Sequence, residues 1–482
     1  MESIVNTLVD YIWSDALVYL ALLVGLYFTI VTKGVQFRYF SEMMRLLKEK
    51  NNSHTGISSF QAFCMSLSGR IGVGNIAGVA TAIAAGGPGA IVWMNIMALL
   101  GGASAFIEST LAQVYKDKNG TEYRGGSPYY IEKGLKLKSF ALLVAFVVCL
   151  SYGVLVPGVQ ANTIAASFEN AFNLPSWASG LIICLLLGVL IFGGIKRIAR
   201  AADLMVPFMA LGYVIFMAIV LITHINNVPE VITTIFKSAF GIDAVFGGIV
   251  GAAISWGVRR AVFSNVAGAG EATFSSAAAE VSHPIKQGLV QGFSVYIDTV
   301  IVCTATAIMI LITGMYNVTP ANSTPLVENI PGVVAGTAFT QAALSTVFGN
   351  LGPIFVSIAI FFFAFTCLMA YYYIAETTMV YLNKKTESSF LSIILKIVFL
   401  IVVYMGSIKS ASLMWGLGDI GFGSMCYLNL IAIVLLTKPA LLTLKDYDRQ
   451  KAQGLDPIFD PEKAGIENAD FWIEYSHKQS LK

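Results

Sequence analysis

The stretch 69-GRIGVGNIAG-78 places four glycines, an arginine and an asparagine inside an otherwise apolar segment. Glycine destabilises a helix interior by about 1 kcal/mol relative to alanine, and Gly69, Gly72 and Gly74 follow one another closely. We therefore expect a helix to unwind here. Unwound carbonyls can bind a cation, and the N-terminus of the half-helix that follows can bind a carboxylate. Close helix packing is the alternative use of small residues in a membrane, and the polar residues that accompany these glycines argue against it.

The composition indicates a membrane protein. The chain has 482 residues, of which 56% are hydrophobic and 12% are charged, and its mean hydropathy is +0.73. Soluble domains are typically about a quarter charged. The formal net charge of +2 gives no electrostatic support for nucleic-acid binding. We therefore expect membrane lipid around the chain, no nucleic-acid partner and no obligatory protein partner.

Eleven apolar runs are long enough to cross a bilayer, because roughly 20 helical residues span its apolar core. The runs lie at residues 16–32, 60–85, 88–114, 139–167, 177–195, 203–224, 244–270, 284–314, 352–381, 389–408 and 411–437. Basic residues, among them Lys48, Lys50, Lys384 and Lys385, are concentrated in alternate connections and in the tail. The positive-inside rule then places the N-terminus outside and the C-terminus in the cytoplasm. The sequence predicts an all-α, multi-pass protein of the cell membrane.

The opening stretch has a counterpart 190 residues later in the chain. The segment 70-RIGVGNIAG-78 aligns with 260-RAVFSNVAG-268, and Arg, Asn, Ala and Gly match in register. The two copies fall in the second and seventh apolar runs. Because the runs are five apart, the two copies cross the membrane in opposite directions. This arrangement is the signature of an inverted-topology repeat, with segments 2–6 set against segments 7–11 and one extra N-terminal helix.

We expect the chain to divide into four parts. They are residues 1–55, an extra transmembrane helix with a basic cytoplasmic loop; 56–225, the first repeat; 226–437, the second repeat; and 438–482, a cytoplasmic tail. The long connection 315–350 contains the apolar stretch 333-VVAGTAFTQAALSTVF-348. We expect it to form an external lid or a re-entrant element, and a surface helix over the bundle is the equal alternative.

Four motifs resemble those of one transporter family. They are 72-GVGNIAGVATAIAAGGPGAIVWM-94, 255-SWGVRRAVFSNVAGAG-270, 283-HPIKQGL-289 and 297-IDTVIVCTAT-306. They closely resemble the alanine or glycine:cation symporters, also called sodium:alanine symporters, and the resemblance covers nearly the whole chain up to the tail. It implies a leucine-transporter-like fold and import of alanine or glycine by sodium symport through alternating access. Sodium-coupled uptake of glutamine or serine, and proton-coupled symport, are the alternatives. The resemblance implies no cofactor, with sodium as the coupling ion.

A second resemblance guides the substrate site. The stretch 71-IGVGN-75 looks like the V-G-L-G-N of the first broken helix in neurotransmitter:sodium symporters. It implies that Gly72 and Gly74 present backbone groups to the substrate carboxylate. Asn75 would orient the amino acid or assist a cation, and a packing role is its alternative. The other implied wall residues are Ser255, Phe263, Ser264 and Asn265, with Phe263 bounding the substrate side chain. Gln160 could face the first break or simply bond another helix.

A cation site is implied by a motif in the ninth run. The segment 364-AFTCLMAYYYIAE-376 resembles the family's F-T-T-x-x-G-W-Y-Y region. The resemblance implies that Thr366 binds sodium together with the carbonyls of Ser68 and Ile71. Cys367 replaces the second threonine as the remaining candidate ligand, although thiol sulfur is a soft ligand and sodium prefers oxygen.

Charged side chains inside a membrane are costly and are candidates for function by default. Arg70, Arg259 and Arg260 lie beside the two expected breaks. The available acidic partners are Glu108, Asp203, Glu271, Asp298 and Glu376. We expect the three arginines and Asp298 to contribute to a cytoplasmic gate, and snorkelling to the inner interface is the alternative.

Other functional classes find little support in the sequence. The chain has no metal-binding helix pair and no serine–histidine arrangement at membrane depth. It also lacks a phosphate-binding loop for ATP. A channel would not need two broken helices in an inverted repeat. We therefore expect a secondary transporter and no enzyme.

Overall fold

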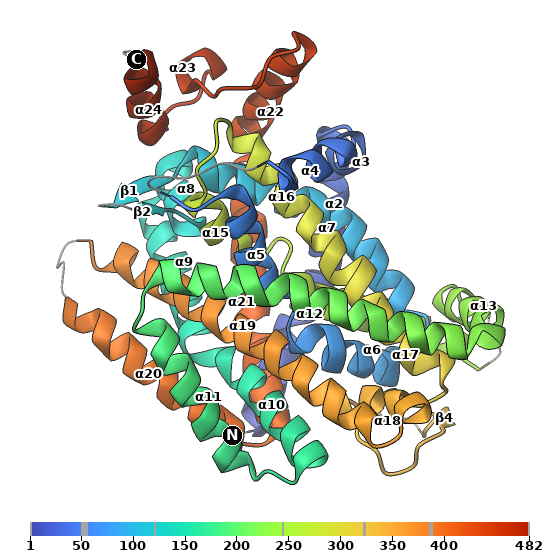
Figure 1. The fold of residues 1–482 in the computed structure, drawn as a ribbon. Helices are drawn as coiled ribbons and strands as arrows, with labels where there is room; N and C mark the ends of the chain where they lie inside the picture. The colour runs from blue at the N-terminus through green and yellow to red at the C-terminus, as the bar shows by residue number, and fades with distance from the viewer. Residues whose placement is uncertain are drawn as a thin grey trace.

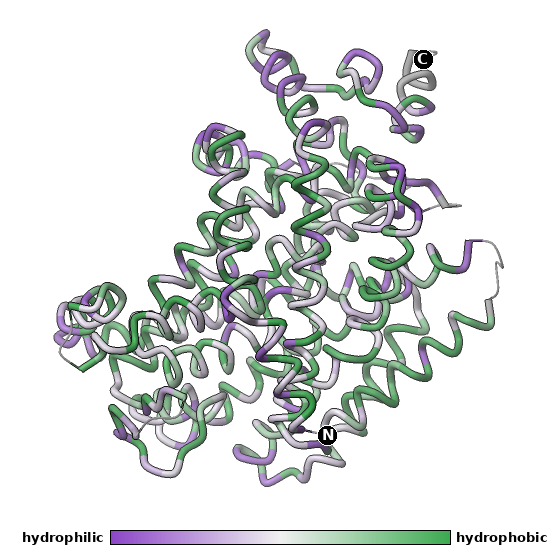
Figure 2. Tube along the Cα trace, turned by 180° about the vertical axis from the view of Figure 1, so that it is seen from behind, coloured by the Kyte–Doolittle hydropathy of each residue, from purple (hydrophilic) through white to green (hydrophobic). Residues whose placement is uncertain are grey.

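The computed structural model describes residues 2–49, 56–119, 122–242, 245–321, 324–384 and 389–480. Lys50 and Lys385, two of the basic residues behind the predicted orientation, lie outside these ranges. Helices dominate the structure, and the two termini lie at opposite ends of the molecule (Figure 1). Apolar residues follow the long helices, and hydrophilic residues gather in the C-terminal tail (Figure 2). The predicted all-α membrane fold is confirmed.

Helices occupy each of the eleven predicted runs. The helices without a break or π-helical turn are α2 (Asp15–Val31), α7 (Ala90–Val114), α11 (Ser176–Ile191), α12 (Ile195–Thr223), α19 (Leu351–Leu382), α20 (Ser389–Ile408) and α21 (Ala411–Leu435). Two further runs contain a π-helical turn: α9 (Lys138–Leu150), η2 (Ser151–Leu155) and α10 (Pro157–Phe172), then α16 (Pro284–Val295), η5 (Tyr296–Cys303) and α17 (Thr304–Ile312). A short α1 (Glu2–Ile12) precedes α2. By length and composition, the described residues contain eight membrane-crossing helices, or nine with one bent pair, so eleven crossings stay a prediction.

The first broken helix lies where the glycines predict it. Helix α5 (Ser59–Arg70) stops, a π-helical turn η1 (Gly74–Gly78) follows, and α6 (Val79–Gly86) continues at an angle of 51°. Gly72 and Gly74 have no left-handed backbone. Instead, a Cβ on Gly72 would lie 2.5 Å from the Cys367 sulfur, and one on Gly74 would lie 3.1 Å from the Ser264 Cα. These glycines therefore allow two other segments to approach the break.

The second broken helix consists of α14 (Val250–Asn265) and α15 (Ala272–Ala278). Between them the backbone is left-handed at Val266, Gly268 and Gly270, with φ of 46°, 86° and 85°. The predicted run 244–270 therefore ended too early, because the segment resumes as α15. Polar residues of α15 hid this continuation, since they lower its hydropathy although the structure buries them.

The two broken helices run antiparallel. Helix α14 packs along α6 and η1, whereas α15 packs along α5. Each half-helix before a break thus lies beside the half-helix after the other break. This agrees with the opposite directions predicted from the two motifs, while correspondence of segments 2–6 with segments 7–11 stays a prediction.

Shorter elements cover the two ends of the bundle. They are α3 (Val35–Arg38), α4 (Phe40–Leu47), the hairpin of β1 (Asp117–Asn119) and β2 (Glu122–Arg124), α8 (Ser127–Leu135), η3 (Ile225–Asn227), α13 (Val228–Ala239), η4 (Gly247–Ile249), the pair β3 (Asn317–Val318) and β4 (Val327–Glu328), and α18 (Thr337–Phe348). Helix α18 packs on α19 and also touches η1 and α6. It lies within the connection 315–350, where either a lid or a surface helix is expected.

The outer surface of the bundle suits hydrocarbon surroundings. Helix α12 exposes Leu204, Phe208 and Leu211, which are 78%, 71% and 64% accessible. Their spacing places them on one face of the helix. Burial in lipid removes the cost of exposing such a face to water.

The C-terminal tail packs against the helix bundle. It comprises α22 (Thr437–Ala452), α23 (Pro461–Ala464) and α24 (Asp470–Ser480). Trp472 of α24 is fully buried. The tail therefore packs as an integral part of the structure.

Candidate functional site

A buried carboxylate lies between the two broken helices. Asn75 of η1 donates from Nδ2 to Asp298 Oδ1 at 2.7 Å, and its own Oδ1 accepts from the Gly72 amide at 2.8 Å. Ser264 and Thr299 donate their hydroxyls to Asp298 Oδ2 at 2.9 and 2.7 Å. Asp298 is fully buried. Side chains from both breaks and from η5 therefore converge on one carboxylate.

This carboxylate makes no direct ion pair among the described residues, although the buried Arg70 guanidinium is near enough to interact with it electrostatically. A buried charge without a directly paired counter-charge is costly in a membrane. Two hydroxyl oxygens and the Asn75 amide nitrogen contact the carboxylate, and the Cys303 thiol lies 3.2 Å from the Ser264 hydroxyl; carboxylate and hydroxyl oxygens are the ligands that hard cations prefer. Asn265, another predicted site residue, donates to Thr299 Oγ1 at 3.0 Å and so belongs to the same cluster. The arrangement can hold a monovalent cation chemically.

Gln160 reaches the first break from α10. Its Oε1 accepts from the Val73 amide at 3.3 Å, and its Nε2 donates to the Tyr371 hydroxyl at 3.0 Å. The structure thus places Gln160 beside the glycines, which is one of its two expected positions. The nearby amides of Gly72 and Val73 are the groups that a carboxylate could bind.

Phe263 closes the other side of the same break. Its ring stacks on Trp415 at a centroid distance of 5.0 Å and meets Phe422 edge-on at 4.8 Å. The ring also lies against the backbone at Gly74. Ser255 precedes Phe263 by roughly two helical turns in α14, so it lies farther from the second break than Phe263 does. The Phe263 ring therefore lies directly beside the first break.

The expected sodium ligands are only partly brought together. Cys367 donates its thiol to the Gly69 carbonyl at 3.1 Å and lies 3.7 Å from the Ile71 carbonyl. Thr366 instead donates to the Phe363 carbonyl of its own helix at 2.9 Å. The Ser68 hydroxyl donates to the Met65 carbonyl, whereas the predicted ligand is the Ser68 carbonyl, whose role stays a prediction. The residue that faces the break from α19 is thus the cysteine, and the Thr366 hydroxyl points away from it.

The arginines do not form one group. Arg259 and Arg260 both pair with Asp419 of α21, at 2.5 and 3.3 Å. Rings of Trp13, Trp256 and Trp415 surround the two guanidinium groups. This cluster lies beside α6 and the N-terminal helix α1, which packs on α21.

Arg70 lies on the other side of the breaks, at the end of α5. It donates to the Gln291 carbonyl at 3.1 Å and to the Ser294 hydroxyl. The three arginines and Asp298, expected to contribute to a cytoplasmic gate, therefore do not form one contact cluster, and their role in a gate stays a prediction. Arg70 and Arg260 occupy matching positions in antiparallel segments, so they point to opposite sides.

Two more buried acidic side chains, Glu108 and Glu271, lie at the second break. Glu108 of α7 accepts from the Gly270 amide at 3.2 Å and from Asn429 at 2.8 Å. Glu271 accepts from the Tyr152 hydroxyl at 2.7 Å. These acids, expected as partners for arginines, accept from backbone, side-chain amide and hydroxyl donors and make no direct ion pair among the described residues, although both interact electrostatically with Arg70.

Sequence reasoning missed several residues of the site. Thr299 and Thr306 belong to the quoted motif 297-IDTVIVCTAT-306, and Thr306 donates to the Asn75 carbonyl at 2.7 Å. Hydroxyls recurring in an apolar run were the available signal. Asp419 had no such signal, because it lies about 160 residues from the arginines it pairs with.

The two broken helices, the oxygen-lined carboxylate and the amides at the first break define a secondary transporter of the broken-helix class. The chain belongs to the sodium:alanine symporter family, whose family model matches residues 1–461. The fold is similar to that of a Na+-coupled sialic acid symporter in a substrate-bound, outward-open state, with a TM-score of 0.50, 13% identity and coverage of 96% of each chain.

Bacterial relatives cover nearly the whole chain. A putative sodium/proton-dependent alanine carrier protein, YrbD of Bacillus subtilis (strain 168), is 54% identical over 99% of each chain. A sodium/proton-dependent alanine carrier protein of Bacillus sp. (strain PS3) is 49% identical over 89% of this chain and 97% of that one. The probable sodium/glutamine symporter GlnT of Bacillus subtilis (strain 168) is 44% identical over 95% of this chain and 93% of its own.

Proposed function

We propose that the protein imports alanine or glycine in symport with sodium by alternating access, with its N-terminus outside and its C-terminus in the cytoplasm. It performs no covalent chemistry on its substrate. Relatives that share 54% and 49% identity carry the name of sodium/proton-dependent alanine carriers, which supports the substrate class. The observation that carries the proposal is the buried Asp298 carboxylate between the two helix breaks.

The coupling cation binds at Asp298. Asn75 donates its side-chain amide to this carboxylate, and Ser264 and Thr299 donate their hydroxyls to it, which brings two hydroxyl oxygens beside the proposed cation. Sodium would neutralise the buried charge, which lowers the cost of keeping the carboxylate ionised away from water. A second cation position is formed by the carbonyls of Gly69 and Ile71 with Cys367, near the predicted ligands Ser68 and Thr366.

The substrate carboxylate binds the amides of the first break. In this conformation Asn75 Oδ1 accepts from the Gly72 amide and Gln160 Oε1 accepts from the Val73 amide. Each side-chain oxygen stands where a substrate carboxylate oxygen would bind. Phe263, held between Trp415 and Phe422, then leaves room for a small side chain only.

Purified protein in proteoliposomes tests the proposal. An imposed sodium gradient should accumulate alanine in the parent, whereas Asp298→Asn should lose the sodium dependence. Asp203→Asn is the matched control, because it removes another acid of an apolar helix, α12, outside the Asp298 cluster. Equal accumulation driven by a proton gradient in sodium-free buffer would contradict the sodium assignment.

Glutamine competition tests the size limit, since a relative that shares 44% identity carries the name of a probable sodium/glutamine symporter. Excess glutamine should leave alanine uptake by the parent largely unchanged, while Phe263→Ala should make uptake sensitive to glutamine. If glutamine competes as well as alanine in the parent, the substrate is not confined to small side chains.

A further inference from the structure

The C-terminal tail packs against one end of the helix bundle, where α5 begins and α15 ends. We call this end of the molecule the tail end. The start of α5 and the end of α15 lie side by side there, joined by a bridge between Ile57 and Ala279. Chain termini are usually poorly ordered unless other contacts hold them. Trp472, near the C-terminus, is nevertheless fully buried and donates from its indole nitrogen to the Gln113 carbonyl at 2.8 Å.

The first anchor is a lysine caged by aromatic rings. The Lys116 ammonium lies 4.6, 4.5 and 5.0 Å from the ring centroids of Tyr123, Phe471 and Trp472. Cation–π contacts of this kind are strongest away from water, and Lys116 is almost fully buried. The same ammonium donates to the Ala279 carbonyl at 2.9 Å. One side chain therefore ties α24 and β2 to the end of α15.

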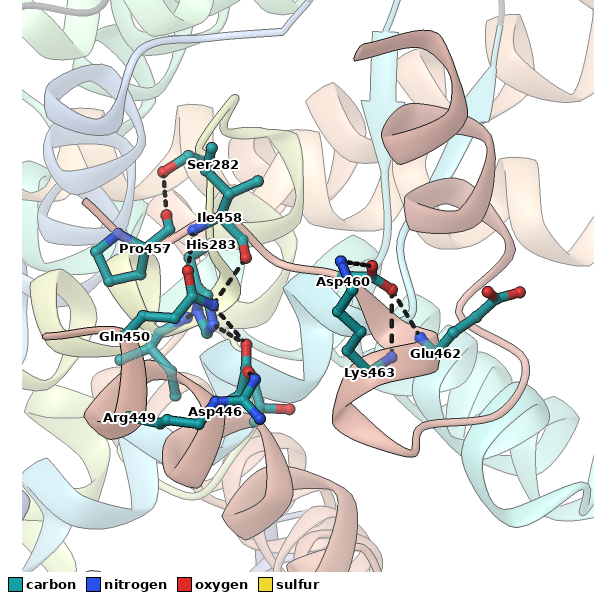
Figure 3. Close-up of polar contacts among 12 residues, drawn as sticks. Ser282, His283, Asp446, Arg449, Gln450, Pro457, Ile458, Asp460, Glu462 and Lys463 are labelled. Carbon is teal, nitrogen blue, oxygen red and sulfur yellow. Dashed lines mark hydrogen bonds and ion pairs between the residues drawn. The ribbon is translucent and has the colours of Figure 1, made fainter. Parts of the chain in front are cut away.

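The second anchor is His283, in the turn before α16. Its Nδ1 accepts from the Ile285 amide at 3.2 Å, and its Nε2 lies 3.4 Å from Asp446 Oδ2. Only the neutral imidazole with its proton on Nε2 satisfies both contacts. Figure 3 shows Asp446, Arg449 and Gln450 of α22 gathered beside His283. The ring also meets Tyr447 and Phe459 edge-on.

Backbone contacts extend this second anchor along the tail. Ser282 donates its hydroxyl to the Pro457 carbonyl at 2.8 Å, and its own carbonyl accepts from the Phe459 amide at 2.9 Å (Figure 3 shows the first contact). The segment between α22 and α23 thus follows the turn between α15 and α16.

The third anchor lies on a different group of helices. Asn468 donates to the Lys133 carbonyl at 3.0 Å, and Asp470 pairs with the Lys133 ammonium at 3.3 Å. Helix α8, which carries Lys133, packs on α9, and α9 packs on α19. Helices α15 and α16 pack mainly on α7, which α8 touches less extensively than it touches α9. The tail therefore bridges two groups of helices at one end of the molecule.

We propose that residues 437–480 form a latch that holds the two helix groups together at the tail end, so that this end opens toward the candidate site only when the latch is released. The inference rests on the proposed transport function. Access to the Asp298 cluster from this side requires α5 and α15 to part from α9 and α19. Any such separation strains the bridge between Lys133 on one group and Lys116 and His283 on the other.

Thiol labelling measures this opening without relying on transport. The Ala370 side chain of α19 lies 3.4 Å from a Cβ built on Gly69 of α5 and is buried, so Ala370→Cys reports the separation of α5 from α19. A membrane-impermeant maleimide applied from the tail side, read by peptide mass spectrometry, should label this cysteine several-fold faster when Trp472→Ala is added. Lys463→Ala is the matched control, because Lys463 pairs with Asp460 within the tail and touches none of the three anchors. Equal labelling in all three proteins would overturn the latch.

A covalent lock covers the case in which Trp472→Ala fails to fold. Tyr123 and Phe471 face each other with ring centroids 5.0 Å apart, so the double variant Tyr123→Cys with Phe471→Cys is expected to crosslink on oxidation. Oxidised protein should lose labelling at Ala370→Cys and alanine transport, and a reductant should restore both. Unchanged labelling after verified crosslinking would contradict the latch. Loss of labelling in a protein that never transports alanine would instead contradict the proposed function alone.

Discussion

At the scale of single residues, Cys367 determines which side-chain atom of α19 faces the second proposed cation position. Its sulfur faces the Gly69 and Ile71 carbonyls, whereas the Thr366 hydroxyl bonds its own helix. Resemblance alone selected Thr366, because a motif gives residue type and not the direction of a side chain. Adjacent positions on a helix point about 100° apart, so only one of the two can face the break.

Cys367→Thr should lower the sodium concentration for half-maximal alanine uptake or leave it unchanged, because a hydroxyl is a harder ligand than a thiol. Thr366→Val should leave this concentration unchanged, since the lost hydroxyl faces away from the break. Sodium titrations of uptake at matched protein levels measure both effects. A marked rise in the sodium requirement of Thr366→Val would restore Thr366 as a ligand.

Among structural elements, the second break depends on backbone conformation more than the first does. Asn429 holds the Gly268 carbonyl at 2.9 Å, and Glu108 accepts from the Gly270 amide. The motif 260-RAVFSNVAG-268 predicted that this helix is interrupted. It could not predict where the helix resumes, because Ser275 and Ser276 look like loop residues until their buried partners, Ser66 and the Ser109 carbonyl, are known.

Gly268→Ala should destabilise the protein, because φ is +86° and the added Cβ would lie 2.6 Å from Leu430. A left-handed backbone costs a non-glycine residue roughly 1–2 kcal/mol, and the overlap adds about 1–3 kcal/mol. Gly251→Ala in α14 is the control, since nothing lies within 4 Å of its added Cβ. That control should gain up to about 1 kcal/mol. Thermal unfolding in detergent measures both, and equal midpoints would show that the break tolerates a side chain.

His283 and Lys116, the buried bases of the tail anchors, should make the stability of the protein depend on pH. Burial lowers the pKa of His283 below its usual value of 6.5, against the opposing effect of Asp446, and burial lowers the pKa of Lys116 to about 7. Both bases therefore bind protons more readily in the unfolded chain, so stability rises with pH. For His283 the rise lies below pH 6.5, and for Lys116 it lies between about pH 7 and 10.5.

His283→Gln should reduce the change of the unfolding midpoint with pH between pH 5 and 6.5. Lys116→Met should reduce that change between pH 7 and 9. Each variant thus serves as the control for the other pH window. Midpoints are measured in detergent with the full chain. Parent-like slopes in both variants would show that neither base titrates on unfolding.

At the scale of the whole molecule, the antiparallel arrangement of the two broken helices determines on which side of the breaks each buried arginine lies. The sequence was sufficient to predict a helical membrane fold, two interruptions and their opposite directions. It did not predict that matching arginines, Arg70 and Arg260, would consequently lie on opposite sides, because the gate was inferred from proximity to the breaks alone. Nor could it supply Asp419, which reaches Arg259 and Arg260 only through the packing of α21.

We propose that the Arg259–Arg260–Asp419 cluster forms a gate on the side of α6, opposite the tail. Asp419→Asn should weaken that closure and increase the fraction of protein open on this side. A larger binding-competent fraction tightens apparent affinity in proportion, so alanine binding in sodium should tighten while uptake slows. Removing one partner of a buried ion pair costs about 3–5 kcal/mol, so unfolding must be followed in parallel.

Glu169→Gln is the control for the gate, because Glu169 accepts from Ser176 at the exposed end of α10, away from the cluster, and should change neither binding nor uptake. Asp419→Glu keeps the charge and should retain most of the closure. Alanine binding by calorimetry and uptake in proteoliposomes separate the outcomes. If Asp419→Asn weakens binding and uptake equally at unchanged stability, the cluster contributes to substrate binding and not to gating. If both quantities stay at the parent values, closure on this side does not depend on the ion pair, and the two arginines serve only to hold α14 against α21.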